Sequence, residues 1–324
     1  MKYRMGIDIG GTKCAVLLGK YGEKSGEEMT LLEKRVFDTR KTGGPEEAIS
    51  CFIRAGDDML EKHALTAGHL EGIGISCGGP LNSETRVILN PPNLPGWRDV
   101  PIGSILERKY GVPVFLENDA NACAIAEWKY GAGRGCRNLI FLTFGTGLGA
   151  GLILDGRLYR GTNDMAGEVG HIRLAECGPV GYGKMGSFEG FCSGCGINQI
   201  ANMKILEQIE MGRKPGLWES AGERGEPDAK TVAAAADEGD ALAREIFAMS
   251  GTYLGKGLSV LIDILNPERI IIGSIFERSR HLIWPYAKEM IERESLQMSR
   301  SVCDIVPSQL GDQIGDYAAL ALIG

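Results

Sequence analysis

Residues 4–18 read RMGIDIGGTKCAVLL, in which two apolar runs are separated by the polar tip Gly10-Gly11-Thr12. This pattern predicts two short strands, at 4–9 and 14–18, that are joined by a tight glycine-rich turn. Residues 139–154 read LIFLTFGTGLGAGLIL and repeat the arrangement, since apolar runs flank a second tip of glycine and threonine. The recurrence indicates an internal duplication, with one such hairpin at the beginning of each half.

The rest of the chain alternates between predicted strands and predicted helices. Further strands are expected at 31–37, 72–77, 112–116 and 269–272, and helices at 45–63, 102–110, 120–130, 231–264 and 317–323. Residues 22–28 predict a polar turn, 90–97 a proline-rich loop and 212–230 a polar surface segment. This alternation is typical of an α/β fold.

The composition narrows the class of protein. A chain of 324 residues suggests about two domains. Its 35 basic and 42 acidic residues give a net charge of −7, which argues against a nucleic-acid partner. There is no apolar run long enough for a membrane span and no apolar signal-peptide core at the N-terminus. Nine scattered cysteines suit free thiols in a reducing compartment, so we expect a cytoplasmic protein.

The first glycine tip predicts a phosphate site. Its bare backbone amides can approach a phosphate closely, and the Thr12 hydroxyl can donate to a phosphate oxygen. Asp8 could hold Mg²⁺, directly or through water. The alternative is a tight hairpin turn that binds no ligand.

The second tip, at 143–150, also matches the dinucleotide fingerprint G-x-G-x-x-A, with Glu168 near the position of an acidic ribose partner. That fingerprint requires a helix directly after the glycines, whereas residues 150–154 predict a strand, so we reject a nicotinamide site. Residues 178–184 approach the Walker A spacing, but Met185 stands where Ser or Thr is needed. Two facing tips could instead clamp a nucleoside triphosphate between two domains.

Asp119 is the candidate general base. It stands where a predicted strand ends and a helix begins, and a carboxylate there can accept the proton of an attacking alcohol. The alternative is a helix N-cap, a position that both Asn118 and Asp119 favour. Glu168, His171 and Glu189 could present polar atoms to a polyol, or they could be ordinary surface residues.

Taken together, the segments 8–13, 117–121, 143–151 and 168–171 resemble the ROK family (repressor, open reading frame, kinase) of sugar kinases. The order and spacing match over essentially the whole chain. The resemblance implies the two-domain actin-like ATPase (ribonuclease H-like) α/β fold, with a cleft between the domains. It also implies ATP- and Mg²⁺-dependent phosphorylation of a hexose or N-acetylhexosamine hydroxyl, as in a glucokinase.

Site residues follow from the resemblance. Asp119 matches the catalytic base. Sugar ligands are expected at Gly79, Asn93, Asn118, Glu168, His171 and Glu189. Nucleotide-binding residues are expected at Asp8, Gly10, Gly11, Thr12, Lys13, Gly145, Thr146, Gly147, Gly149 and Gly273, and Ser274 stands where the family usually has a second glycine. The small domain is expected at 1–117 plus 312–324 and the large one at 118–311, in a homodimer.

One departure concerns the structural zinc that the family commonly binds with one histidine and three cysteines. The three cysteine positions are occupied here by Val180, Tyr182 and Ser187, so the usual site cannot form, and we expect no structural zinc. A substitute site made of His171 with Cys177, Cys192 and Cys195 is conceivable, because the last two have ligand spacing. The alternative is three free thiols.

Two other functions were weighed. ROK repressors carry a DNA-binding helix-turn-helix before the first hairpin, whereas only five residues precede Gly6. A sugar-binding regulator without catalysis would have lost some of the residues named above, and all are present. The sequence does not identify the sugar, the hydroxyl that is phosphorylated or the preferred phosphoryl donor.

Overall fold

The computed structural model describes residues 2–22, 29–217 and 227–324. The chain forms two compact units. The first contains Met1–Gly135, Gly151–Ala166 and Asp312–Gly324, and the second contains Cys136–Ala150 and Gly167–Gly311. Residues 118–135 and 151–166, which the sequence analysis assigns to the large domain, therefore pack within the first unit.

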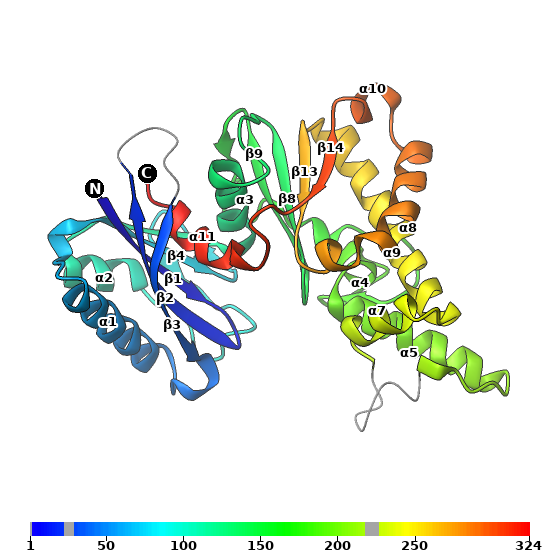
Figure 1. Ribbon diagram of the computed structural model, residues 1–324, viewed down its shortest axis with the longest axis horizontal. Coiled ribbons are helices and arrows are strands. Elements are labelled where there is room, and N and C mark those ends of the chain that lie inside the picture. The colour runs from blue at the N-terminus through cyan, green and yellow to red at the C-terminus, as the bar shows by residue number, and fades with distance from the viewer. Residues whose placement is uncertain (1, 23–28, 218–226) are drawn as a thin grey trace. The chain divides into compact units, whose positions relative to one another are not determined.

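The first unit is built on a mixed five-stranded sheet (Figure 1). Its strands, in spatial order, are β3 (Thr30–Asp38), β2 (Lys13–Tyr21), β1 (Lys2–Ile9), β4 (Leu70–Cys77) and β7 (Val114–Asn118). Strand β1 pairs antiparallel with β2 and parallel with β4, and β7 continues the parallel part. The helices of this unit are α1 (Pro45–Lys62), α2 (Ile102–Tyr110), α3 (Asp119–Tyr130) and α11 (Ile314–Ala321). The hairpin predicted at 4–18 is confirmed.

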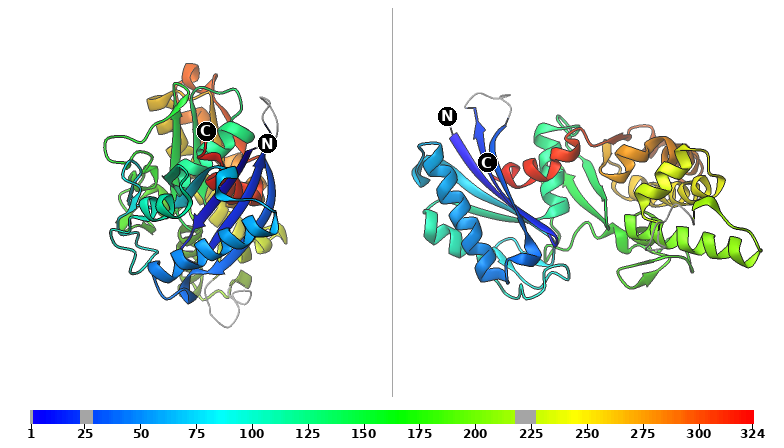
Figure 2. Two further views of the ribbon diagram at one scale, coloured as in Figure 1. Left: turned by 90° about the vertical axis from the view of Figure 1, so that its left-hand side faces the viewer. Right: turned by 60° about the horizontal axis from the view of Figure 1, so that its bottom comes forward.

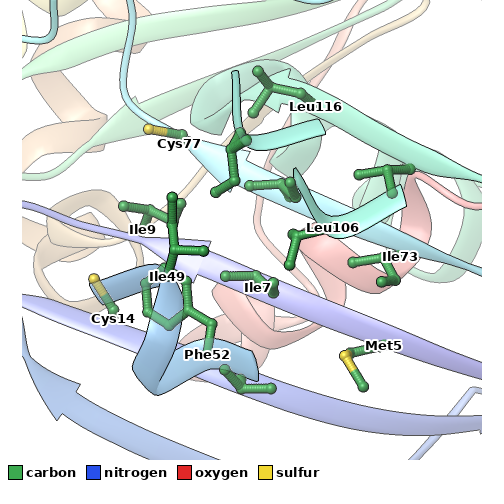
Figure 3. Close-up of a cluster of buried hydrophobic side chains, with 14 of the residues drawn as sticks. Met5, Ile7, Ile9, Cys14, Ile49, Phe52, Ile73, Cys77, Leu106 and Leu116 are labelled. Atoms are coloured by element: carbon green, nitrogen blue, oxygen red, sulfur yellow. The ribbon is translucent and has the colours of Figure 1, made fainter. Parts of the chain in front are cut away.

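Both faces of this sheet are covered. Successive residues of a strand point to opposite faces, and in β2 Leu18 belongs to the core formed with α1 and α2, whereas Leu17 packs with α11. Figure 2 shows the blue and teal helices α1 and α2 on one side of the sheet and the red α11 on the other. Figure 3 shows the first of these cores, in which Phe52 of α1 lies against Ile7 of the sheet. Burial on both faces explains why the central strands β2 and β4 are largely apolar, whereas the edge strand β3 is polar and alternately exposed.

The second sheet repeats the plan of the first. Its spatial order is β10 (Arg157–Leu158), β9 (Leu148–Leu154), β8 (Leu139–Phe144), β13 (Arg269–Ile272) and β14 (Asp304–Pro307). Strands β8, β13 and β14 are parallel, as are β1, β4 and β7. The two sheets therefore share one strand order, which supports the predicted duplication. Strand β9 follows directly after the second tip, which confirms that no dinucleotide-binding helix begins there.

Helices make up most of the second unit. They are α4 (Phe188–Phe191), α5 (Gly194–Glu210), α7 (Ala229–Asp237), α8 (Ala241–Leu265), α9 (Ile275–Glu294) and α10 (Gln297–Arg300). Short two-residue strands form the pairs β5 (Leu81–Asn82) with β6 (Val87–Ile88), in the first unit, and β11 (Val180–Gly181) with β12 (Lys184–Met185), in the second. Helices α8 and α9 pack closely because Gly251 and Gly255 of α8 meet backbone oxygens of α9; a Cβ at either glycine would lie 2.5 Å from one.

The sequence expectations differ from the structure at several elements. The helix expected at 231–264 is two helices, because Gly239 has a positive φ and the Asp240 side chain caps α8. The strand expected at 112–116 begins two residues later, and the Walker-like stretch at 178–184 runs through the β11–β12 hairpin. Most of the polar segments at 22–28 and 212–230 lies outside the described residues. Within the part of the chain that is described, no helix is long and apolar enough to cross a membrane.

Candidate functional site

Asp8 lies in the first unit, next to the end of β1 and opposite Ser76 in the register with β4. Burial raises the pKa of its carboxyl to about 7, and the charges of Asp119 and Asp316 add to this effect. The hydrogen bond from Ser76 and the charge of Lys34 oppose it. Burial and acidic neighbours therefore disfavour the ionised form of Asp8, and a divalent cation bound there would stabilise it.

The first glycine tip is ordered by hydrogen bonds within the turn and from Thr39. The Gly10 amide donates to the Lys13 carbonyl at 3.1 Å and closes the turn, while the Thr39 hydroxyl donates to the Gly10 carbonyl at 2.7 Å. Thr12 and Lys13 are exposed. A Cβ on Gly11 would lie 2.7 Å from the carbonyl oxygen of Asn93, so only glycine lets the 90–97 loop approach the tip this closely.

Asn118 and Asp119 divide the two roles that the sequence left open. Asn118 is the N-cap of α3, and its Oδ1 accepts the Ala120 amide at 2.9 Å. Asp119 is the first helical residue; its Oδ1 also accepts the Ala120 amide, at 2.8 Å. Solvent reaches Asp119, yet the protein atoms around it remove enough water to raise the pKa of its carboxyl. Asn118 therefore holds the N-cap position, and the two side chains share the Ala120 amide.

The expected sugar ligands of the first unit lie close together. A Cβ on Gly79 would be 3.3 Å from Nδ2 of Asn118, and one on the preceding Gly78 would be 3.3 Å from Nδ2 of Asn93. Because the Oδ1 atom of Asn118 is used in capping, its Nδ2 amide remains as the donor on that side chain. Hydrogen-bonding groups of these residues thus gather beside Asp119, as a polyol site requires.

The second glycine tip is anchored in the second unit. The Gly145 amide donates to the Gly147 carbonyl at 3.1 Å, and Oγ1 of Thr143 accepts the Gly149 amide at 2.9 Å. The first amides of α5 donate back to the tip, from Gly194 to the Gly145 carbonyl at 2.7 Å. The tip is therefore ordered by hydrogen bonds that need no ligand.

Glu189 lies directly against this tip. Its Oε2 accepts the Leu148 amide at 3.0 Å, and a Cβ on Gly147 would be 2.8 Å from the same oxygen. Glu168 and His171 are exposed at the two ends of a short 3-10 helix, and Gly170 between them packs against the Cβ of Glu189. The structure thus brings Glu168, His171 and Glu189 together in the second unit.

A pocket of about 850 Å³ opens beside the second tip, within the second unit. Gly145 and Thr146 line it, together with Ser274 at the start of α9, while Gly273 lies against Phe141. Sequence reasoning missed other lining residues, namely Asn198, Asp228, Lys230 and Arg278. The polar residues at the starts of α7 and α9 were the available signal, but nothing in the sequence shows that these helices converge.

The sequence pattern of the ROK family matches residues 4–324, nearly the whole chain. The chain is a member of the ROK family. The expected fold class, the two-domain actin-like ATPase fold, is thereby confirmed, since solved ROK structures superimpose over the chain.

Relatives of this ROK chain include enzymes and repressors. It is 32% identical to a glucokinase of Halalkalibacterium halodurans over 97% of the chain and 92% of the relative. A xylose repressor of Caldicellulosiruptor bescii is 30% identical over 98% of the chain and 77% of the repressor. A ROK glucokinase of Streptomyces griseus, solved with glucose and AMPPNP, has a TM-score of 0.76 at 28% identity, and the match covers 99% of both chains.

The residues at the family's zinc position do not fit a zinc ion. Ser187 is buried and caps α4, with its Oγ accepting the Gly190 amide, and Val180 has no donor atom in its side chain. The Cys192 thiol is buried and donates to the Ser250 carbonyl, whereas Cys177 and Cys195 are exposed. Across the described ranges, no group of three or more His, Cys, Asp or Glu side chains is placed to hold a metal ion.

Hydrogen bonds hold the β11–β12 hairpin, which carries one of the family's zinc positions, Val180, on β11. Gln199 of α5 accepts the Val180 amide and donates to the Val180 carbonyl, both at 2.8 Å. At the other end of the hairpin the Lys184 ammonium donates to the His171 carbonyl at 2.7 Å. Hydrogen bonds therefore fasten the β11–β12 hairpin to α5 and to the backbone of His171.

Proposed function

We propose that this protein is an ATP- and Mg²⁺-dependent sugar kinase that phosphorylates a hydroxyl of a hexose or N-acetylhexosamine, with Asp119 as the general base. The observation that carries the proposal is the state of Asp119. It is reached by solvent, it is the first residue of α3 while Asn118 holds the N-cap position, and its surroundings raise the pKa of its carboxyl. A carboxylate with a raised pKa is a stronger base than an ordinary aspartate.

The reaction follows from these residues. Hydrogen bonds from the Asn118 amide and the other sugar ligands would hold the hydroxyl beside Asp119. The carboxylate accepts the hydroxyl proton as the sugar oxygen bonds to the γ-phosphorus, and the bond from that phosphorus to the β–γ bridging oxygen breaks, releasing ADP. The tip amides at 145–149 and the pocket beside them would hold the nucleotide.

The residues also fit a magnesium ion. Burial first, and then the neighbouring carboxylates Asp119 and Asp316, raise the pKa of Asp8; a cation would offset this cost of ionisation, so Asp8 would hold Mg²⁺, directly or through water. When bound, the ion would neutralise charge on the phosphates. The chemistry at the sugar is carried by Asp119.

A coupled assay of ADP release over a panel of hexoses and N-acetylhexosamines tests the function. We expect sugar-dependent ADP release for at least one member of the panel. In Asp119→Asn, the loss of the base should lower kcat by about 10²–10⁴-fold, while nucleotide affinity changes little. Wild-type activity in this variant would reassign the base, and inertness of the wild type toward the whole panel would refute the kinase.

A sugar-responsive regulator is the second candidate, because a xylose repressor is among the relatives. A regulator would bind a monosaccharide, as measured by calorimetry, without consuming ATP. Sugar binding without ADP release would favour it over the kinase.

A further inference from the structure

Glu117, which precedes Asn118 and Asp119, is a buried carboxylate that the proposed reaction does not use. It is 1% exposed at the end of β7. A carboxylate removed from water in this way needs several hydrogen bonds to remain ionised. Its Oε1 accepts the Asn118 amide at 3.1 Å and Nδ2 of Asn121 at 3.0 Å, and its Oε2 accepts Nε of Arg160 at 2.7 Å.

Two of these bonds flank the proposed base. Asn118 is the residue before Asp119, and Asn121, itself buried, lies two residues after it in the first turn of α3. Because one oxygen of Glu117 holds both, the backbone that carries Asp119 is fixed on each side.

The third bond joins Glu117 to a separate segment of the same unit. Arg160 begins the stretch 160–166, which closes on itself through the Ala166 amide and the Arg160 carbonyl at 3.1 Å. Asp164 fastens this stretch by accepting both the amide and the hydroxyl of Ser83, at 2.9 and 2.7 Å. In the sequence, Glu168 follows two residues after Ala166.

We propose that the Glu117–Arg160 ion pair positions Asp119 for proton abstraction, and that Glu117 and Arg160 are positioning residues rather than catalytic ones. This role rests on the proposed kinase function. The pair is desolvated at Glu117 and open to solvent at Arg160, whose side chain is 44% exposed. The buried Glu117 side of the pair therefore fixes the start of α3.

The test compares kcat and KM in variants that change the charge but keep the shape. Glu117→Gln retains an oxygen acceptor for Asn118 and Asn121 but loses the ion pair with Arg160. Since small displacements of a reacting group can lower rates by about 10²-fold, we expect kcat to fall by about 10–100-fold. The KM for ATP should stay within about twofold of wild type, as for any loss confined to the chemical step. Arg160→Met should act in the same direction, and Arg160→Lys should recover part of the loss.

Glu127→Gln is the matched control. Glu127 is a fully buried glutamate near the other end of α3, where it accepts the Ala132 amide at 2.7 Å. If Glu117→Gln loses kcat and Glu127→Gln, at a similar loss of melting temperature, does not, the positioning role is supported. Equal losses of kcat, or unchanged kcat in folded Glu117→Gln, would overturn it while leaving the kinase in place. An inactive wild type would refute the kinase, and the positioning role with it.

Discussion

Asp8 is surrounded by charges of its own sign, and this has a consequence for stability. Its carboxyl ionises near 3.8 when unperturbed and near 7 in the folded protein. Between these pH values the folded state keeps a proton that the unfolded state has released. Stability from this residue is therefore full below about pH 4 and is lost as the pH rises toward 7.

Asp8→Asn should remove this dependence. Asn cannot ionise, so without ligands the variant should melt several degrees above wild type at pH 8 and near it at pH 4. Thermal unfolding of both proteins at several pH values measures the difference. A gap that does not widen with pH would show that Asp8 is ionised at no cost in the folded state.

Ser274 carries backbone strain at the edge of the pocket. Its φ of 59° and ψ of −111° lie in a region that glycine adopts readily, and the family usually has glycine here. Relief of such strain is worth about 1–3 kcal/mol, whereas a serine cap replaced by glycine costs only a few tenths. Ser274→Gly should therefore raise the free energy of unfolding by about 1 kcal/mol. Ser274→Ala keeps the strain and loses the cap, so it should be less stable than wild type; the opposite ranking in urea titrations would contradict the argument.

Among elements, the two hairpins could be predicted from sequence because each is local, with strands adjacent in the chain and a turn marked by glycine. Helix α9 could not, because Pro285 and many charged residues obscure its apolar face. The role of Asp119 was undecided for a similar reason. Both Asn118 and Asp119 can cap a helix, and both accept the Ala120 amide, so only the observed helix start shows that Asn118 holds the N-cap position.

The β11–β12 hairpin is the element where this chain departs from its family, and Gln199 is its fastening. Gln199→Leu removes both bonds to Val180 and should loosen the hairpin that holds the His171 carbonyl. We expect the looser hairpin to weaken sugar binding by the free energy of about one hydrogen bond. The KM for the sugar should therefore rise by about 10-fold, with the KM for ATP unchanged.

Gln208→Leu, near the C-terminal end of the same helix, is the control for α5 itself, since Gln208 contacts only Arg213 among the bonds described for its side chain. Chelation followed by restoration of Mg²⁺ should leave the activity of wild type intact. Stoichiometric zinc in the purified protein, or inactivation that only zinc reverses, would show that a metal and not Gln199 fastens the hairpin.

At the scale of the whole molecule, duplication gives two sheets with the same strand order, whereas the two units carry different expected ligand groups. The pocket beside the second tip is lined only by residues of the second unit, while Asp119, Asn118, Gly79 and Asn93 all belong to the first. The two units carry different ligand groups because different segments come after the two hairpins. Loops and α3 come after the first hairpin, and the helices α5, α7 and α9 come after the second.

Amide hydrogen exchange can distinguish nucleotide binding by the second unit from sugar binding by the first. A non-hydrolysable ATP analogue alone should slow exchange at the second tip and at the starts of α5, α7 and α9, because those backbones line the pocket. A hexose alone should slow exchange at 78–94 and 118–121 in the first unit. Strand β3 is an edge strand that contributes no residue to the pocket or to the segments 78–94 and 118–121, so it serves as the internal reference. Protection of 78–94 by the nucleotide alone, with none around the pocket, would mean that the second tip does not hold the triphosphate and that the nucleotide assignment is wrong.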